Sequence, residues 1–248
     1  TIINTALPAI ALSLQEDPLR MHSVVVAYVL SVAICIPLSG WLADRFGVRN
    51  TYFSAIIIFT LASIGCAVSN SLNELLFYRV LQGIGGALLL PVGRLAMLKI
   101  IPRTQFLAAM SLMSLAGLIG PLIGPTLGGW MVEYLSWQWV FLINLPIGLL
   151  GTLITFKAMP NVTEPDVAKF DYAGFVMLVV AMVGLCLGIE NFANPQYPLW
   201  WSLSLVAAGF LFSLIYAYHS HTHSNALFRS KLFKNRIYSI GILGNFFA

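Results

Sequence analysis

The sequence predicts an all-α membrane protein that crosses the bilayer several times. Hydrophobic residues make up 59% of its 248 residues and charged residues only 9%, whereas a soluble domain carries roughly a quarter charged residues. Apolar stretches of the length that an α-helix needs to cross a bilayer recur along the whole chain. Lys and Arg gather in alternate connections between these stretches. Together these observations indicate a polytopic helical bundle.

The apolar stretches define the expected helices in chain order. Residues 1–14 are interpreted as the end of a first helix, and further helices are expected at 22–43, 50–69, 73–98, 105–131, 137–157, 171–190 and 200–218, with another beginning near 237. Connections that contain Gly, Pro, Asn or charged residues separate them. The chain begins without an initiator Met and stops inside the apolar run GILGNFFA. We therefore expect it to be a fragment of a longer membrane protein.

The distribution of basic residues predicts how the helices are oriented. Lys and Arg accumulate on the cytoplasmic side of membrane proteins. Every second connection is basic, with ten of the chain's cations: Arg45, Arg49, Lys99, Arg103, Lys157, Lys169, Arg229, Lys231, Lys234 and Arg236. The opposite connections hold only Arg20. The connection at 44–50 is thus predicted to be cytoplasmic. Separately, the net charge of +4 suggests no nucleic-acid partner.

Several polar side chains are expected at membrane depth. Arg79 and Arg94 lie within the helix predicted at 73–98. A charge inside the membrane is costly and marks a candidate functional site, although a residue near a helix end can extend its charge to the interface instead. Asn4, Gln82 and Asn144 are candidates to line a polar cavity. The alternative for these three is hydrogen bonding between helices.

The cytoplasmic connection GWLADRFGVRN, from Gly40 to Asn50, is the most distinctive loop. Gly47 permits a tight reversal between two helices. Asp44 lies at the C-terminal end of its helix, where the dipole disfavours an anion, so we expect it to have a cationic or helix-N-terminal partner. Arg45 and Arg49 supply positive charge on the cytoplasmic side.

The stretch GPLIGPTLGG places glycines and prolines inside a predicted membrane helix. Glycines at three- or four-residue spacing share one helix face and let another helix approach closely. Each proline lacks an N–H and should bend the helix. We therefore predict a kinked, closely packed helix whose key residues are Gly117, Gly120, Pro121, Gly124, Pro125, Gly128 and Gly129.

The sequence carries no pattern typical of an enzyme, a metal site or a bound cofactor. Its three cysteines lie inside apolar stretches and match no metal motif. His219 and His223 are four residues apart, as on one helix face, but no carboxylate or cysteine accompanies them in the sequence. A solvated loop is the preferred interpretation of this segment. The run GIGG at 83–86 follows no strand and is interpreted as a packing motif.

These stretches resemble the major facilitator superfamily. The 40–50 connection is similar to the superfamily's signature between its second and third helices, with Asn50 in place of a basic residue. RVLQGIGGA, from Arg79 to Ala87, resembles its fourth-helix motif, and GLIGPLIGPTLGGWM resembles the antiporter signature of the fifth helix. TIINTALPAI and WQWVFLINLPIGLL resemble the fourteen-helix drug:proton antiporters of the EmrB/QacA type.

The resemblance implies roles for the motif residues. Gly40, Asp44, Arg45, Gly47 and Arg49 would form a cytoplasmic gate motif that clamps against the other half of the protein. By this resemblance, Arg79 would take part in proton transfer. The family's proton-pathway Asp would lie just upstream of Thr1, outside this chain. The seven Gly and Pro residues of the fifth-helix signature would form an antiporter motif that prevents proton leakage.

The resemblance also implies a domain plan and a function. Four parts are expected: an N-terminal bundle with a truncated first helix (1–158), two linking helices (159–218), a basic cytoplasmic loop lying on anionic lipid (219–236) and the start of a C-terminal bundle (237–248). The function implied is proton-coupled efflux of drug-like compounds across a bacterial inner membrane. Expected partners are the bilayer, a small-molecule substrate, protons and a periplasmic adaptor protein. Transport of a specific metabolite is the alternative, and a receptor or enzyme without transport is a third interpretation.

Overall fold

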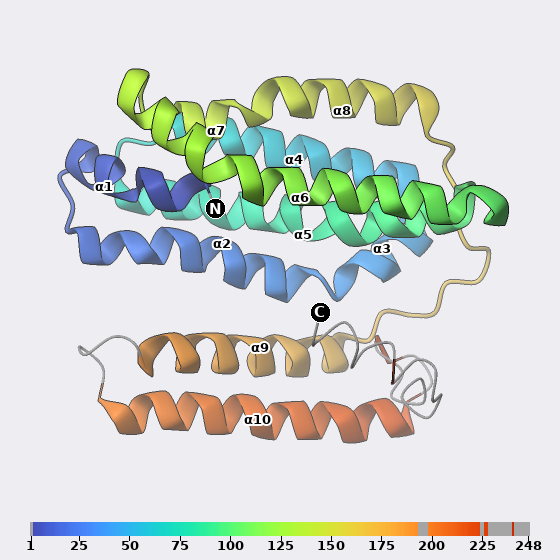
Figure 1. Ribbon diagram of the computed structural model, residues 1–248. Coiled ribbons are helices and arrows are strands. Elements are labelled where there is room, and N and C mark those ends of the chain that lie inside the picture. Colours follow the sequence, from blue (N-terminus) through green and yellow to red (C-terminus); the bar gives the residue numbers. More distant parts are fainter. Residues whose placement is uncertain (1, 193–197, 224–225, 228–239, 241–248) are drawn as a thin grey trace. The chain divides into compact units, whose positions relative to one another are not determined.

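The computed structural model describes residues 2–192, 198–223, 226–227 and 240. The chain forms two compact units, Thr1–Pro165 and Asp166–Ala248, and each is considered by itself. Within the described residues every regular element is helical (Figure 1). Seven of the helical stretches there are long and apolar enough to cross a membrane.

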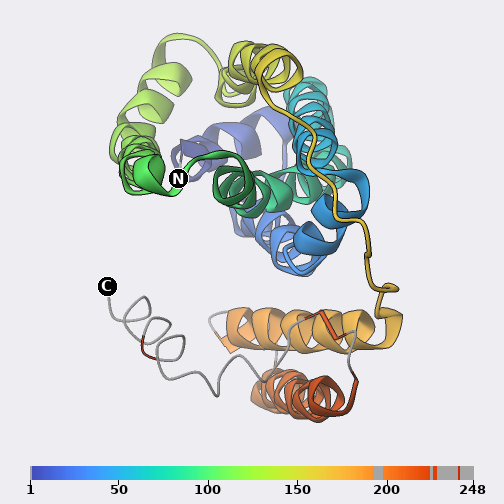
Figure 2. The same cartoon turned by 90° about the vertical axis from the view of Figure 1, so that its right-hand side faces the viewer.

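The first unit is a bundle of roughly aligned helices. It consists of α1 (Ile2–Leu14), a 3₁₀ turn (Pro18–Met21), α2 (His22–Cys35), α3 (Leu38–Phe46), α4 (Val48–Val68), α5 (Leu72–Ile100), α6 (Arg103–Tyr134), α7 (Trp139–Leu142) and α8 (Asn144–Ala158). Helix α5 packs against both α2 and α4, while α8 packs on α4 and α1 packs on α6. Figure 2 shows these helices nearly end-on. Because α5 packs against two neighbouring helices, polar side chains on it can be buried, as Arg79 and Gln82 are.

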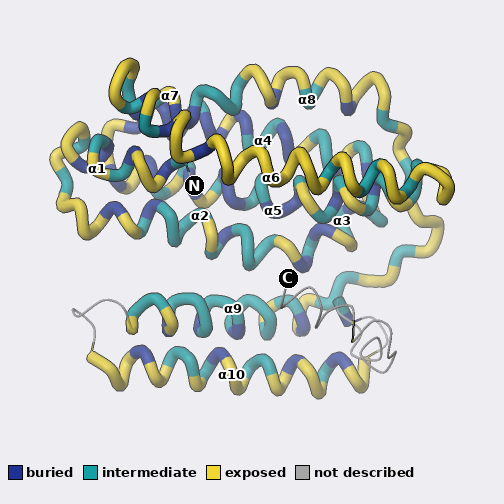
Figure 3. The backbone as a smooth tube through the Cα atoms, viewed as in Figure 1, coloured by how far each residue is buried: buried dark blue, intermediate teal, exposed yellow. Residues whose placement is uncertain are grey.

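Two apolar clusters stabilise this bundle. One joins the 3₁₀ turn with α1, α2, α4, α5, α6 and α7 and includes the fully buried Ile10, Met21, Val24 and Leu75. The other joins α3, α4 and the C-terminal half of α5 through Ala43, Val48, Ala55, Leu88, Val92 and Ala96. Figure 3 shows buried residues recurring along α4 and α5, whereas α6 is largely exposed. Exposed apolar side chains are expected on helices that face lipid or another part of a membrane protein.

The structure corrects two predicted helices. The helix expected at 22–43 is divided into α2 and α3, because turn residues Ile36 and Pro37 interrupt it. Proline cannot donate the backbone hydrogen bond that would continue the helix. The helix expected at 137–157 is divided at Ile143 into α7 and α8. By contrast, α5 continues through Pro91.

Helix α6 is continuous through both of its prolines, Pro121 and Pro125. Figures 1 and 2 show its C-terminal part bending away from the direction of its first half. The bend agrees with the predicted kink, and the chain is helical on both sides of the prolines.

The second unit contains two helices, α9 (Tyr172–Phe192) and α10 (Leu199–Thr222), which pack along each other. Gly184, Gly188 and Gly209 lie at this contact, where a Cβ on Gly184 would come within 2.9 Å of the Leu205 carbonyl oxygen. Helix α10 extends beyond the predicted end at 218. Most of the predicted loop 219–236 and helix start 237–248 lies outside the described residues.

Candidate functional site

A buried arginine is the centre of the polar site in the first unit. Arg79 on α5 is only 6% exposed. Its Nε donates to the Val24 carbonyl of α2 at 3.1 Å, and its Nη1 donates to Gln82 Oε1 at 2.5 Å. The guanidinium also lies 4.2 Å from the ring centroid of Tyr28, a cation–π contact. Arg79 is therefore fixed by groups from α2 and from its own helix.

The hydrogen bonds continue from Gln82 to two further helices. Gln82 Nε2 donates to Ser63 Oγ of α4 at 2.6 Å. Asn144 Nδ2 of α8 donates to the same oxygen at 3.3 Å, and Ser63 Oγ itself donates to the Phe59 carbonyl. The network Arg79–Gln82–Ser63–Asn144 thus links α5, α4 and α8. We call these four residues the polar network.

Three of the five polar residues that the sequence places at membrane depth meet in one place. Arg79, Gln82 and Asn144 belong to the polar network, and its hydrogen bonds between helices match the alternative considered for Gln82 and Asn144. The other two, Asn4 on α1 and Arg94 on α5, are exposed. The sequence interpretation missed Ser63 and Tyr28, because neither residue type is unusual in a membrane helix.

Glycines of α5 allow the close packing that encloses this network. A Cβ on Gly83 would lie 2.7 Å from the Tyr28 carbonyl oxygen of α2. A Cβ on Gly85 would lie 2.7 Å from the Phe59 nitrogen of α4. Because both obstacles are backbone atoms, any larger residue forces the helices apart. The run GIGG is therefore the packing motif that its sequence predicted.

The residues expected to form a gate motif lie in α3, at the Gly47 turn and at the start of α4. Gly47 has a φ of +89°, in the region that favours glycine, so the tight reversal is confirmed. Asp44 has the predicted cationic partner, since Lys99 Nζ at the end of α5 lies 2.9 Å from Asp44 Oδ1. Arg45 is exposed, and the guanidinium of Arg49 lies 6.0 Å from the Phe156 ring centroid. Gly40 has open space where its Cβ would be.

The antiporter motif of α6 divides into a packed part and an open part. A Cβ on Gly124 would meet the Ile2 side chain at 3.1 Å, and one on Gly128 would meet the Ile2 carbonyl oxygen at 2.9 Å. These two glycines carry the predicted close contact, and α1 is their partner. Open space surrounds the Cβ positions of Gly117, Gly120 and Gly129, and Pro121 and Pro125 are exposed. The predicted close packing therefore covers only part of the motif.

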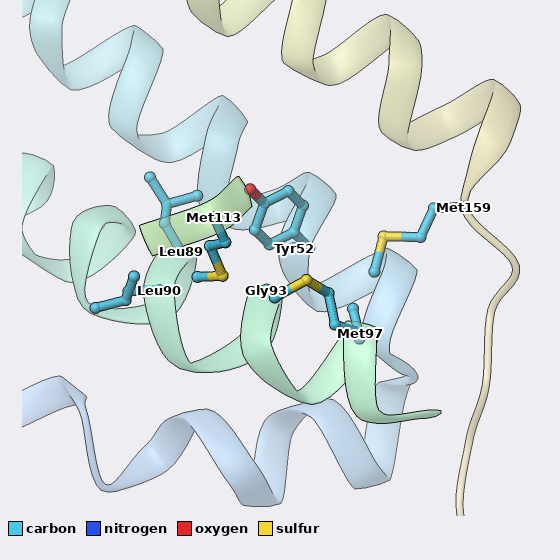
Figure 4. A pocket seen from close by; sticks show the side chains of 8 residues that line it. Tyr52, Leu89, Leu90, Gly93, Met97, Met113 and Met159 are labelled. Atoms are coloured by element: carbon cyan, nitrogen blue, oxygen red, sulfur yellow. The ribbon is translucent and has the colours of Figure 1, made fainter. Parts of the chain in front are cut away.

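An apolar cavity of about 450 Å³ lies beside the C-terminal half of α5. Its lining is apolar except for the Tyr52 hydroxyl and comprises Tyr52, Leu89, Leu90, Gly93, Ala96, Met97, Met113 and Met159. Figure 4 shows the thioethers of Met97, Met113 and Met159 arranged around the Tyr52 ring. Methionine side chains adapt readily to apolar groups of different shape. The lining of this cavity contains none of the polar-network residues.

The second unit overturns the interpretation of the histidine segment as a solvated loop. His219 lies within α10, and its Nε2 is 3.0 Å from Asp171 Oδ2, so a carboxylate does accompany it. Asp171 Oδ1 also accepts from the Gly174 backbone N–H at the start of α9. The rings of His219 and His223 stack with their centroids 4.1 Å apart. This arrangement fastens the ends of α9 and α10 to each other.

Metal and disulfide chemistry receive no support from the part of the chain that is described. No group of three His, Cys, Asp or Glu residues there is arranged to hold a metal ion. The cysteines Cys35, Cys66 and Cys186 are free. The chemically distinctive groups described in the first unit are thus the buried Arg79 guanidinium and the ion pair between Lys99 and Asp44.

Comparison with known proteins shows which family the chain resembles. The family model described as Major Facilitator Superfamily matches residues 1–244. The chain is 51% identical over 246 residues to the "Putative multidrug resistance protein MdtD" of Salmonella dublin, which covers 99% of this chain and 52% of that relative. It is 50% identical over the same shares to the proteins of that name from Salmonella typhi and Salmonella typhimurium. The chain spans about half the length of the curated relatives it matches.

The match, the helices of membrane-spanning length and the motif geometry lead to one assignment. The family model covers nearly the whole chain, and the relatives align over almost all of it. The chain therefore belongs to the Major Facilitator Superfamily and is part of a multi-pass membrane protein.

Proposed function

We propose that the full-length protein is a proton-coupled secondary transporter that exports drug-like amphipathic compounds. Transporters of this architecture bind substrate near the membrane midplane and expose the site alternately to each side. The relatives' name associates them with multidrug resistance. The observation that carries the proposal is the buried Arg79, fixed within a network that joins three helices.

A buried guanidinium suits a proton-coupled site because it stabilises a nearby carboxylate in its ionised form. In the described helices the acidic residues lie at or near the ends, as Asp44, Glu74, Glu133 and Glu190 do. We therefore propose that the carboxylate that carries the proton lies outside residues 1–248 and that Arg79 is its partner. Substrate and proton would compete for the same charged pair, which couples their movements.

The gate motif would control access from the cytoplasm. Asp44 would leave Lys99 and engage the other half of the transporter when the cytoplasmic side closes. The antiporter motif would supply a contact for that half through its open glycines, Gly117, Gly120 and Gly129. A bacterial inner membrane and a periplasmic adaptor protein complete the proposed setting.

The test is transport by the purified full-length protein in proteoliposomes. With a pH gradient imposed, uptake of several lipophilic cations should follow the gradient and stop when a protonophore collapses it. Uptake that persists without the gradient would exclude proton coupling. Uptake of one polar metabolite and of none of the lipophilic cations would favour the alternative of a specific metabolite transporter.

A further inference from the structure

The segment that follows α8 forms a strap across the gate motif. We define the strap as residues 159–165, which belong to the first unit. The Val48 backbone N–H donates to the Val162 carbonyl at 3.1 Å, and the Glu164 N–H donates to the Asp44 carbonyl at 3.2 Å. Backbone hydrogen bonds thus hold the strap at both ends of the connection between α3 and α4.

A side chain of the strap covers the turn at Gly47. Asn161 Oδ1 accepts from the Asn50 backbone N–H at 3.4 Å, and its Nδ2 donates to the Phe46 carbonyl at 3.5 Å. A Cβ on Gly47 would collide with this amide. The turn therefore has both a positive φ and an occupied space where a larger residue would be placed.

The strap also brings a second carboxylate to Lys99. Lys99 Nζ lies 2.7 Å from Glu164 Oε1 and 2.9 Å from Asp44 Oδ1. The Lys99 side chain is 16% exposed, whereas those of Asp44 and Glu164 are 39% and 47% exposed. One cation thus serves two carboxylates. Mutual repulsion of the carboxylates weakens the hold of Lys99 on each of them.

We propose that Glu164 is a positioning residue of the cytoplasmic gate, sharing Lys99 with Asp44 and keeping this cation paired when Asp44 moves away. Removing one partner from a partly buried ion pair costs free energy because the remaining charge loses its compensation. With Glu164 in place, Asp44 can leave without that cost. The proposal deepens the proposed function, because it rests on Asp44 being the mobile carboxylate of the gate.

The reactivity of Lys99 tests the sharing directly. Inside-out vesicles that contain the full-length protein would be treated with a membrane-impermeant amine reagent, and modification of Lys99 would be followed by mass spectrometry. Asp44→Asn mimics departure of the gate carboxylate. Because Glu164 still binds Lys99 in that variant, its modification rate should stay within about twofold of wild type. In Asp44→Asn/Glu164→Gln the rate should rise about twofold to fivefold above that of Asp44→Asn, the effect of losing one exposed ion pair.

Asp166→Asn is the matched control, since it removes a negative charge two residues further along the chain. Asp44→Asn/Asp166→Asn should react like Asp44→Asn alone. If Asp44→Asn alone already reacts as fast as the double variant with Glu164→Gln, Glu164 does not hold Lys99 and the proposal fails. This measurement needs no transport activity, so it is independent of the outcome for the proposed function.

Transport kinetics then test the role in the gate. Glu164→Gln leaves Lys99 paired with Asp44 and without its second described carboxylate, and it should lower the maximal transport rate about twofold to fivefold, with KM unchanged. The same substitution in a Lys99→Gln background should have no further effect, because its partner is gone. Equal effects in both backgrounds, or a wild-type rate for Glu164→Gln, would overturn the gating role. Wild-type protein that transports none of the lipophilic cations would instead contradict the proposed function.

Discussion

Gln82 donates a hydrogen bond of 2.6 Å to Ser63, and this bond joins α5 to α4 in the interior of the bundle. Both side chains are almost fully buried, with 2% and 1% exposure. Ser63 also accepts from Asn144 of α8. A single hydroxyl therefore connects the arginine-bearing helix to two neighbours, and its position decides whether Gln82 can orient Arg79.

Replacing Ser63 by Ala should lower both stability and transport. The change leaves the amides of Gln82 and Asn144 without their acceptor, at a cost of about 0.6–2 kcal/mol for a hydrogen bond between membrane helices. Thermal unfolding of the full-length protein in detergent measures the stability. Ser54→Ala is the control, since Ser54 is an exposed residue of α4 that bonds only within its helix. Equal melting temperatures for the two variants would show that the hydrogen bonds of Ser63 between helices do not stabilise the bundle.

Replacing Gly85 by Ala should force α5 away from α4. The added methyl group would lie 2.7 Å from the Phe59 nitrogen and 2.9 Å from the Ala55 carbonyl oxygen, neither of which can move without moving the helix. Overpacking of this kind costs about 1–3 kcal/mol. Gly93→Ala on the same helix is the control, because its nearest neighbour is the Tyr52 side chain at 3.5 Å. The comparison requires only melting temperatures, and a stable Gly85→Ala protein would contradict the packing described.

Replacing Gly47 by Ala should impair the proposed gate. The substitution is unfavourable at a φ of +89° and places a methyl group against Asn161, at a cost of about 1–3 kcal/mol for the backbone alone. Transport by the variant should fall, and Asn161→Ala should restore only the part due to the collision. Gly40→Ala belongs to the same motif but has open space, so it should transport like wild type. Lower transport activity for Gly40→Ala than for Gly47→Ala would contradict the geometry described for the turn.

The two parts of the antiporter motif should respond differently to leucine. Gly128→Leu would collide with the Ile2 carbonyl oxygen and Thr5 of α1, so it should destabilise the first unit. Gly120→Leu meets open space and should fold normally, yet it should impair coupled transport by obstructing the proposed contact with the other half. Circular dichroism and proton-driven uptake separate the two effects. Normal coupling in Gly120→Leu would count against the proposed role of the open glycines.

The sequence predicted the elements whose signals are local. Apolar length located the helices, and the spacing of Arg79 and Gln82 by three residues placed both on one face of α5. Charge position predicted that Asp44 would have a cationic partner, which is Lys99. Each of these predictions rests on residues close together in sequence or on the unfavourable position of an anion at a helix C-terminus.

The remaining features depend on contacts between distant segments. Proline alone did not decide helix continuity, since Pro37 ends a helix whereas Pro91 does not. Ser63 joins the polar network only because α4 packs closely on α5. The strap meets the gate motif more than a hundred residues away in sequence, through Asn161 and Asn50. Likewise, Asp171 reaches His219 only because α9 and α10 pack along each other. A local sequence pattern does not predict such contacts between distant segments.

Substrate-dependent proton release by the purified full-length protein tests the central claim most directly. In weakly buffered detergent solution, addition of a lipophilic cation should release protons from wild-type protein. Arg79→Ala should release none. Without the guanidinium, nothing stabilises the ionised form of the carboxylate that carries the proton, so this carboxylate keeps its proton when the substrate binds. Arg94→Ala, which changes an exposed arginine of the same helix, should behave like wild type. Proton release that survives in Arg79→Ala would contradict the assignment of the buried arginine to the coupling site.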